Sequence, residues 1–502
     1  MPFGTADILA GGEKHARKRR LAPIVTSVAV VLAIVLGGGA FTAMKLLASS
    51  GSQPDTWAPA NSIAFAKVDL DPSASAKVAA WEFEQKFPQA PKIASSDQLK
   101  DGLLSAAFKD ADQIDYATDV KPWLGDRVAV AVFLNTAGKP QPIYILQVTD
   151  GAKAKAGLNK MIAAAGVTDP TSGDVAAFSI QGSYAILGQT EAVVDDAIAQ
   201  AKKADISTNA DYKADIAQLN SDRIVTSWWD LGATLKAVSS ELPGQANALL
   251  MSGGLTGLPD MTKAGRLVMG LRVQPSYVEM QGRVLGSSAS SQLKDGDAGS
   301  ALGNLPGGTV AGVALANPEQ LVKTELDQMK TGLIGTSVQS EFDQLGAQLG
   351  ISVPADIENL LGSQLAVGVN ALPGGEQALG QMFVTVMTHP DDLAKAKQTA
   401  QILLSNLGPA AGGIIKVSTQ GQLLVGTDNP KAASGKLSDS PAYRSALDGM
   451  PSQSVAAGYI DLSSIIAAVP DAPSGLAPLQ SVGFYFGTDS TSPVFSVRLT
   501  VK

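Results

Sequence analysis

The 502-residue chain contains no cysteine and only two histidines, His15 and His389. The absence of cysteine excludes disulfide bonds, thiol catalysis, cysteine-based zinc sites and lipidation of a thiol. His15 lies in a basic N-terminal cluster, so His389 is the single imidazole in the remainder of the chain. It precedes Pro390 at a predicted strand-to-helix junction, where a turn or cap role is favoured because no second histidine can join it as a metal ligand. We therefore expect no cofactor and no metal site.

Several catalytic motifs are also missing. No Gly-x-Ser-x-Gly elbow, no P-loop and no Gly-x-Gly-x-x-Gly sequence occurs. The carboxylates nearest to a constellation are Asp69 and Asp71, which would share one face of a strand. A second copy of this segment, described below, has Ala316 and Asn317 at the matching positions, which favours a structural role over an acid pair. The sequence therefore predicts no catalytic residue.

Charge is distributed unevenly along the chain. Residues 1–20 carry five basic and two acidic side chains, whereas residues 46–502 carry 32 basic and 44 acidic ones. The five basic residues are Lys14, Arg17, Lys18, Arg19 and Arg20. An excess of acidic side chains repels phosphate backbones, so we expect no nucleic-acid partner.

A run of 24 residues from Leu21 to Met44 has no charged side chain. A helix of this length can cross a hydrocarbon core of about 30 Å. The run is longer than a signal-peptide core, which favours an uncleaved anchor at residues 21–47 over a cleaved signal. Because the basic cluster precedes the run, we expect a single-pass protein of the cell membrane, with a cytoplasmic N-terminus and an extracytoplasmic C-terminal domain.

Six sequence blocks recur in the same order, about 240 residues apart, which indicates an internal duplication. The matched pairs are residues 63–72 and 310–318, 123–132 and 360–369, 141–149 and 381–388, 184–188 and 423–426, 211–212 and 442–443, and 228–231 and 459–462. Alternating or β-branched runs predict strands in each copy, and short turns between neighbouring strands favour antiparallel pairing.

The predicted fold class is therefore α+β: a single N-terminal transmembrane helix followed by two tandem homologous α+β repeats with mainly antiparallel sheets. The predicted divisions are a cytoplasmic stub (1–20), the anchor (21–47), a tether (48–56), repeat 1 (57–285), a linker (286–304) and repeat 2 (305–502). Four residues that precede predicted helices are expected to act as helix caps. They are Asp71, Asn317, Asp230 and Asp461.

The basic stub, the uncharged run and the segment at residues 57–73 together resemble actinobacterial membrane-anchored proteins of the domain of unknown function 3352 (DUF3352) family. Residues 83–88 and the Trp123-Leu124-Gly125 strand entry add to the similarity, which extends over most of residues 55–502. The resemblance implies a membrane-anchored envelope protein. It implies no substrate, cofactor or catalytic residue.

Two hypotheses about function remain open. The first is a non-catalytic binding or scaffolding module that holds an envelope protein, a lipid or a polymer between its two halves. The second is an envelope hydrolase that works through carboxylates alone. The first hypothesis is favoured, because catalytic motifs are missing and because the second copy lacks the acid pair.

Overall fold

The computed structural model describes most of the chain after residue 51. The described residues are 52–87, 101, 113–165, 175–220, 222–241, 265–287, 296–331, 335–371, 382–406, 415–428, 435–469, 471–489 and 492–502. We call residues 52–287 the first half and residues 296–502 the second half.

The first half contains eight strands and, between them, helices and short helical turns. The strands are β1 (Ser62–Asp69), β2 (Leu124–Leu134), β3 (Pro140–Val148), β4 (Ala177–Gln181), β5 (Tyr184–Gly188), β6 (Arg223–Asp230), β7 (Arg266–Gln274) and β8 (Tyr277–Leu285). The helices and turns are η1 (Pro54–Trp57), α2 (Ala74–Gln85), η2 (Tyr116–Val120), α4 (Gly151–Ala165), α5 (Glu191–Lys203), η3 (Ile206–Thr208), α6 (Ala210–Ile216) and α7 (Leu231–Glu241).

The second half contains another eight strands. They are β9 (Thr309–Ala316), β10 (Gln364–Ala371), β11 (Met382–Thr388), β12 (Lys416–Gln420), β13 (Leu423–Thr427), β14 (Gln453–Asp461), β15 (Leu479–Asp489) and β16 (Ser492–Val501). Its helices and turns are α9 (Ala298–Gly303), α10 (Pro318–Thr331), α11 (Gly335–Leu349), α12 (Ala355–Leu361), α13 (Leu393–Asn406), η7 (Leu437–Asp439), α15 (Pro441–Ala446), α16 (Leu462–Ala468) and η8 (Ser474–Leu476). The segment predicted as a linker thus contains α9.

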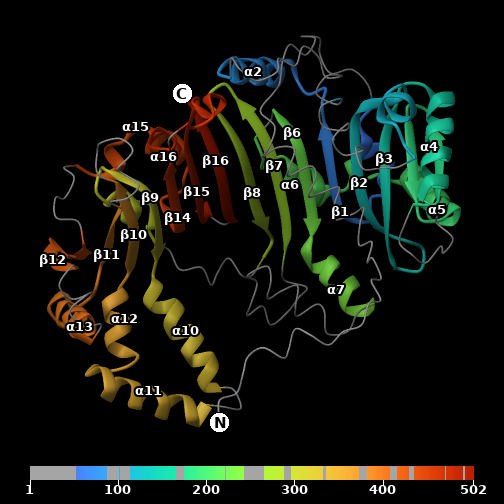
Figure 1. The fold of residues 1–502 in the computed structure, drawn as a ribbon. Helices are drawn as coiled ribbons and strands as arrows, with labels where there is room; N and C mark the ends of the chain where they lie inside the picture. Colours follow the sequence, from blue (N-terminus) through green and yellow to red (C-terminus); the bar gives the residue numbers. More distant parts are fainter. Residues whose placement is uncertain are drawn as a thin grey trace, which may run out of the picture.

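All sixteen strands of the described residues belong to one antiparallel sheet (Figure 1). From the outer edge inward, the first half has the order β4-β5-β3-β2-β1-β6-β7-β8, and the second half has β12-β13-β11-β10-β9-β14-β15-β16. The two orders correspond strand for strand, and the matched sequence blocks lie on corresponding elements. The halves meet where β8 pairs with β16, the last strand of each.

The predicted fold class was wrong. A single sheet runs through both halves, whereas we expected a transmembrane helix followed by repeats with sheets of their own. The physical reason is that each half ends in a strand whose outer edge has free N–H and C=O groups, and these two edges satisfy each other. No helix within the described ranges is long and apolar enough to cross a membrane. The predicted anchor from Leu21 to Met44 and the five basic residues before it lie outside those ranges.

One face of the sheet is buried under helices in each half. In the first half, α5, η3 and α6 cover a core that includes Phe65, Ile143, Ile186 and Trp228. In the second half, α9, η7 and α15 cover the corresponding face. Strand positions that face these helices alternate with positions that do not, as the pleat requires.

The opposite face of the second half is apolar as well, although several of its side chains are exposed. Val313 of β9 is 50% exposed. In the sheet it pairs with Gly458 of β14, Gly458 pairs with Phe484 of β15, and Phe484 pairs with Val497 of β16. On β9 the larger apolar side chains, Val313 and Leu315, thus lie on the exposed face, whereas the covered face has Ala314 and Ala316. Hydrophobic alternation alone does not show which face the helices cover.

Two of the four predicted cap residues accept a backbone hydrogen bond at the start of a helix. The carboxylate of Asp461 accepts from the Ser464 N–H of α16 at 2.9 Å, and that of Asp230 accepts from the Ala233 N–H of α7 at 2.8 Å. These bonds satisfy donors that a helix cannot satisfy internally.

The remaining predicted caps are Asn317 and Asp71. Asn317 directly precedes α10, with a positive φ of 49°. Asp71 does not cap α2, because the helix begins three residues later and its N-cap is Ser73, whose hydroxyl accepts from the Ala76 N–H at 3.3 Å. The carboxylate of Asp71 forms ion pairs instead, as described below.

The seam between β8 and β16 contains a buried cluster of charges around Glu279, which is 1% exposed. Its carboxylate accepts from Arg498 of β16 at 2.8 Å and from Arg272 of β7 at 2.7 Å. Ser496 donates a further hydrogen bond at 2.9 Å. The guanidinium carbons of Arg498 and Arg272 lie 4.3 and 5.3 Å from the centre of the Tyr277 ring. Three strands from both halves therefore share one carboxylate.

We expect Glu279→Gln to lower the free energy of unfolding by about 3–5 kcal/mol, because two guanidinium groups lose their buried counter-charge. Burial raises the pKa of Glu279, but the charges and hydrogen bonds of Arg498 and Arg272 outweigh it and hold the pKa below its ordinary value of 4.5. A depressed pKa stabilises the fold above the unfolded-state value and loses this effect as the pH falls. Urea unfolding from pH 7 to pH 3 measures both effects.

The matched control is Asp489→Asn, which removes an ion pair to Arg283 of β8 from a carboxylate that is 50% exposed. Exposed pairs contribute under about 1 kcal/mol, so this variant should unfold nearly as the wild type does. A Glu279→Gln protein as stable as this control, with an unchanged pH profile below pH 4.5, would contradict the prediction.

Candidate functional site

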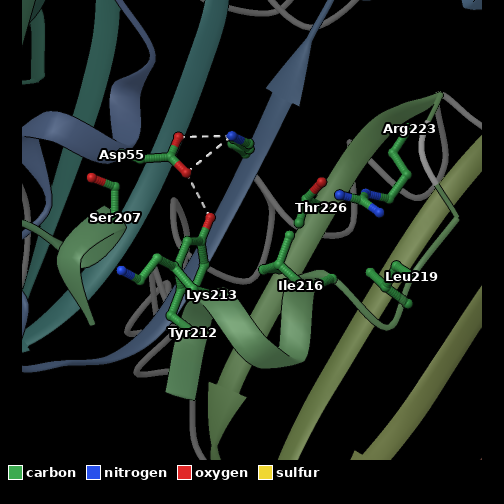
Figure 2. A pocket seen from close by; sticks show the side chains of 10 residues that line it. Asp55, Ser207, Tyr212, Lys213, Ile216, Leu219, Arg223 and Thr226 are labelled. Atoms are coloured by element: carbon green, nitrogen blue, oxygen red, sulfur yellow. Dashed lines mark hydrogen bonds and ion pairs between the residues drawn. The ribbon is translucent and has the colours of Figure 1, made fainter. Parts of the chain in front are cut away.

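A charged groove lies on the helix-covered face of the first half, where η1, α6, β1 and β6 meet (Figure 2). It consists of two adjoining cavities of about 450 and 330 Å³. Lys67, Arg223 and Thr226 line both cavities. Lys67 of β1 and Thr226 of β6 are register partners, so their side chains emerge on the same face of the sheet.

Asp55 of η1 is held at one end of the groove by two partners. Its carboxylate forms an ion pair with the Lys67 ammonium at 2.8 Å and accepts from the Tyr212 hydroxyl at 2.6 Å. Burial, together with the negative charge of Asp55, raises the pKa of Tyr212. Tyr212 therefore stays a neutral donor at physiological pH, and the three groups form a fixed polar cluster.

A second ionic network lies beside the groove and includes Asp69 and Asp71, for which the sequence favoured a structural role. Arg127 of β2 is 1% exposed and contacts Asp69 at 3.1 Å and Asp71 at 3.3 Å. Lys77 of α2 forms another ion pair with Asp71. Burial alone would lower the pKa of Arg127, but the neighbouring negative charges outweigh it and raise the pKa above its ordinary value. Both carboxylates are therefore neutralised by cations.

At the position of the groove, the second half has the corresponding strands but different side chains. The registers with the neighbouring strands put Ala314 where the first half has Lys67, and Ala457 where it has Thr226. The same comparison matches the Asp69–Arg127 pair with Ala316 and Gln364.

The small side chains of the second half make room for α9. This helix lies across β9, β10 and β14, and its Ala301 and Leu302 pack on Ala314 and Ala316. Ser454, which matches Arg223 at the same strand irregularity, accepts from the Gly299 N–H of α9 at 2.9 Å. The groove of the first half thus lies where a helix covers the second half.

Arg223 differs from the other cations of the first half. Its guanidinium donates to the Asn220 carbonyl, and burial lowers its pKa. Within the described part of the chain, no carboxylate lies within ion-pair distance of Arg223 or of Lys213 in α6. Thr226 is 4% exposed, and its hydroxyl has no hydrogen-bond partner among the described residues. All three side chains line the larger cavity of the groove.

His389 lies at the end of β11, far along the chain from the groove. Its Nδ1 is 3.2 Å from the Ser363 hydroxyl, which forms a serine-histidine contact. The Ser363 N–H donates to the His389 carbonyl at 2.9 Å, and the Gly362 N–H donates to Glu358. Both of these backbone N–H groups are therefore occupied and cannot stabilise an oxyanion.

The two adjacent tryptophans have different environments. Trp228 is 2% exposed and donates to Asp215 at 2.8 Å inside the core. Trp229, on the opposite face, donates to the Ser227 hydroxyl at 2.6 Å. In the part of the chain that the structure describes, no group of three or more histidine, aspartate or glutamate side chains could hold a metal ion.

The groove residues Lys67, Tyr212, Arg223 and Thr226 were not singled out from the sequence. For Lys67 and Thr226 a signal was present: a charged or hydroxyl side chain at a strand position where the other copy has alanine. This signal could be read only from the strand registers. The sequence blocks align with small gaps, so the sequence alone does not show which residues of the two copies correspond.

We expect Arg127→Gln to lower the free energy of unfolding by about 3 kcal/mol, because it leaves two partly buried carboxylates without their guanidinium. The double variant Asp69→Ala/Arg127→Gln reproduces the pair found in the second half and should recover part of this loss. Urea midpoints of both variants test the coupling. A double variant less stable than Arg127→Gln would show that the two side chains do not act as a pair.

Comparison with known proteins gives one family. A family model described as "Protein of unknown function (DUF3352)" matches residues 25–407. Searches of curated proteins and of solved structures found no match.

Proposed function

The chain belongs to the DUF3352 family of proteins of unknown function, as predicted from its sequence, and we propose that it is a non-catalytic binding protein whose ligand site is the charged groove of the first half. The actinobacterial source and the membrane anchor stay predictions. They rest on the residues of the N-terminal segment and on the resemblance described above.

The difference between the two halves is the observation that carries this proposal. The second half builds the same strands with Ala314 and Ala457 in place of Lys67 and Thr226, so the fold does not need an ammonium or a hydroxyl group at these positions. Partly buried charges cost stability unless they are paired. A groove lined by such groups in one copy only supports a role in binding.

The alternative, a carboxylate-dependent envelope hydrolase, is less well supported. A general acid or base has to exchange a proton with a substrate. Asp55 is bound by Lys67 and Tyr212, and Asp69 and Asp71 are bound by Arg127. These three carboxylates therefore act as structural counter-ions.

We further propose that the protein acts outside the cytoplasm, attached to the cell membrane through residues 21–47. The basis is the 24-residue uncharged run and the basic cluster that precedes it. An envelope protein, a lipid or a polymer is then the class of partner available to the groove.

Occupation of the groove should protect Lys213, which is exposed at its rim, from chemical acetylation. The measurement is peptide mass spectrometry of the full-length protein after brief acetylation, with and without an extract of the cell envelope. Lys416 of β12 is exposed and distant from the groove, so it is the internal control. We expect a loss of acetylation at Lys213 of several fold and none at Lys416.

Two outcomes would contradict the binding proposal. One is equal acetylation of Lys213 with and without extract. The other is turnover of peptidoglycan, glycan or ester substrates by the wild type that an Asp55→Asn/Asp69→Asn variant loses. Such turnover would favour the hydrolase instead.

The proposed location predicts the result of proteolysis on intact protoplasts. Externally added protease should remove the groove-bearing part of the chain and leave a short N-terminal fragment that includes residues 1–20. Permeabilised protoplasts, in which both sides are accessible, are the control. Full protection of the chain in intact protoplasts would refute the location.

A further inference from the structure

We propose that the larger cavity of the groove binds a small anionic ligand, with a phosphate or carboxylate group held by Arg223 and Thr226 and an apolar part against Ile216 and Leu219. This inference rests on the proposed function and specifies the chemistry of the ligand.

The charge balance of the cavity lining is the first argument. One carboxylate, Asp55, and three cations, Lys67, Lys213 and Arg223, line the cavity. Asp55 and Lys67 neutralise each other. Lys213 and Arg223 remain without a carboxylate partner among the described residues, so the cavity has an excess of positive charge.

The second argument is the position of Arg223 and Thr226. They lie three residues apart at the start of β6, and Figure 2 shows the guanidinium group and the hydroxyl group on the same side of the strand. A guanidinium and a hydroxyl can together donate to the oxygens of a phosphate or carboxylate. Such an anion would supply the partner that the Thr226 hydroxyl lacks among the described residues.

The third argument concerns the smaller cavity, which is lined by two carboxylates, Asp222 and the Asp69 that is bound by Arg127. Asp222 accepts hydrogen bonds from Ser73 at 2.9 Å and Ser75 at 2.8 Å, at the beginning of α2. Both hydrogen bonds end on Oδ1 of Asp222, on the α2 side. Arg223 lines both cavities, and Asp222 does not line the larger one.

The apolar part of the ligand follows from the remaining lining. Ile216 is the last residue of α6, and Leu219 follows just after it. In Figure 2, Ile216 lies between Tyr212 and Arg223, and Leu219 lies below Arg223. A cavity of about 450 Å³ is within the range of small-molecule sites. A short alkyl chain attached to the anionic group would bury apolar surface here.

The experiment uses the full-length protein in detergent and isothermal titration with three probes: hexyl phosphate, inorganic phosphate and hexan-1-ol. We expect hexyl phosphate to bind most tightly. Arg223→Gln should weaken its binding roughly 10-fold or more, because a charge-assisted pair is lost. Thr226→Val, which keeps the shape of the side chain, should weaken it by a smaller factor.

Arg444→Gln is the matched control. Arg444 of α15 is exposed, and it is the residue of the second half that corresponds to Lys213. It should bind hexyl phosphate as the wild type does. Thermal unfolding without probe checks that each variant folds. If Arg223→Gln does not fold, Thr226→Val and Arg223→Lys, which keeps the charge but not the planar fork, still test the anion contact.

The possible results of the titrations distinguish this inference from the proposed function. Hexan-1-ol binding as tightly as hexyl phosphate would overturn the anionic ligand while the groove remains a binding site. Inorganic phosphate binding as tightly as hexyl phosphate would overturn the apolar contact. Binding of hexyl phosphate that Arg223→Gln and Thr226→Val leave unchanged, or no binding of any probe, would overturn this inference. Protection of Lys213 by envelope extract would still support the proposed function.

Discussion

The antiparallel pairing of β8 with β16 is the contact on which the rest of the architecture depends. It converts two eight-stranded arrays into one sheet, and it places Glu279 where arginines from both halves share its carboxylate. Without this pairing, each half would present a long strand edge with unsatisfied backbone groups. The groove is built on the same sheet: β6, which carries Arg223 and Thr226, is two strands from the seam.

Duplication followed by divergence explains how one fold carries a site in only one of its halves. In the second half, α9 fills the covered face, and Ala314, Ala316 and Ala457 provide the space for it. In the first half, the corresponding face carries Lys67, Asp69 and Thr226. The second half thus serves as an internal reference for what the fold requires, and the departures from it in the first half indicate function.

The charges of the first half fall into two groups with different physical roles. Arg127, Asp69 and Asp71 neutralise one another, and Asp55, Lys67 and Tyr212 form a closed polar cluster. These groups fix the walls of the groove. Arg223 is desolvated and has no carboxylate at ion-pair distance among the described residues, which costs free energy that a bound anion would offset.

Local features follow from the sequence alone: most of the strands in the two copies and the caps at Asp230 and Asp461, because these depend on side-chain periodicity and on contacts within four residues. Only the tertiary structure decided the pairing of β8 with β16, whose partners lie more than 200 residues apart. It also decided the role of Asp71, which depends on Arg127, and the partnership of Asp55 with Tyr212, 157 residues away. Apolar residues on both faces of β9 left the covered face undetermined. The common reason is that ion pairs, sheet edges and burial depend on distances between elements, and periodicity along one segment carries no information about them.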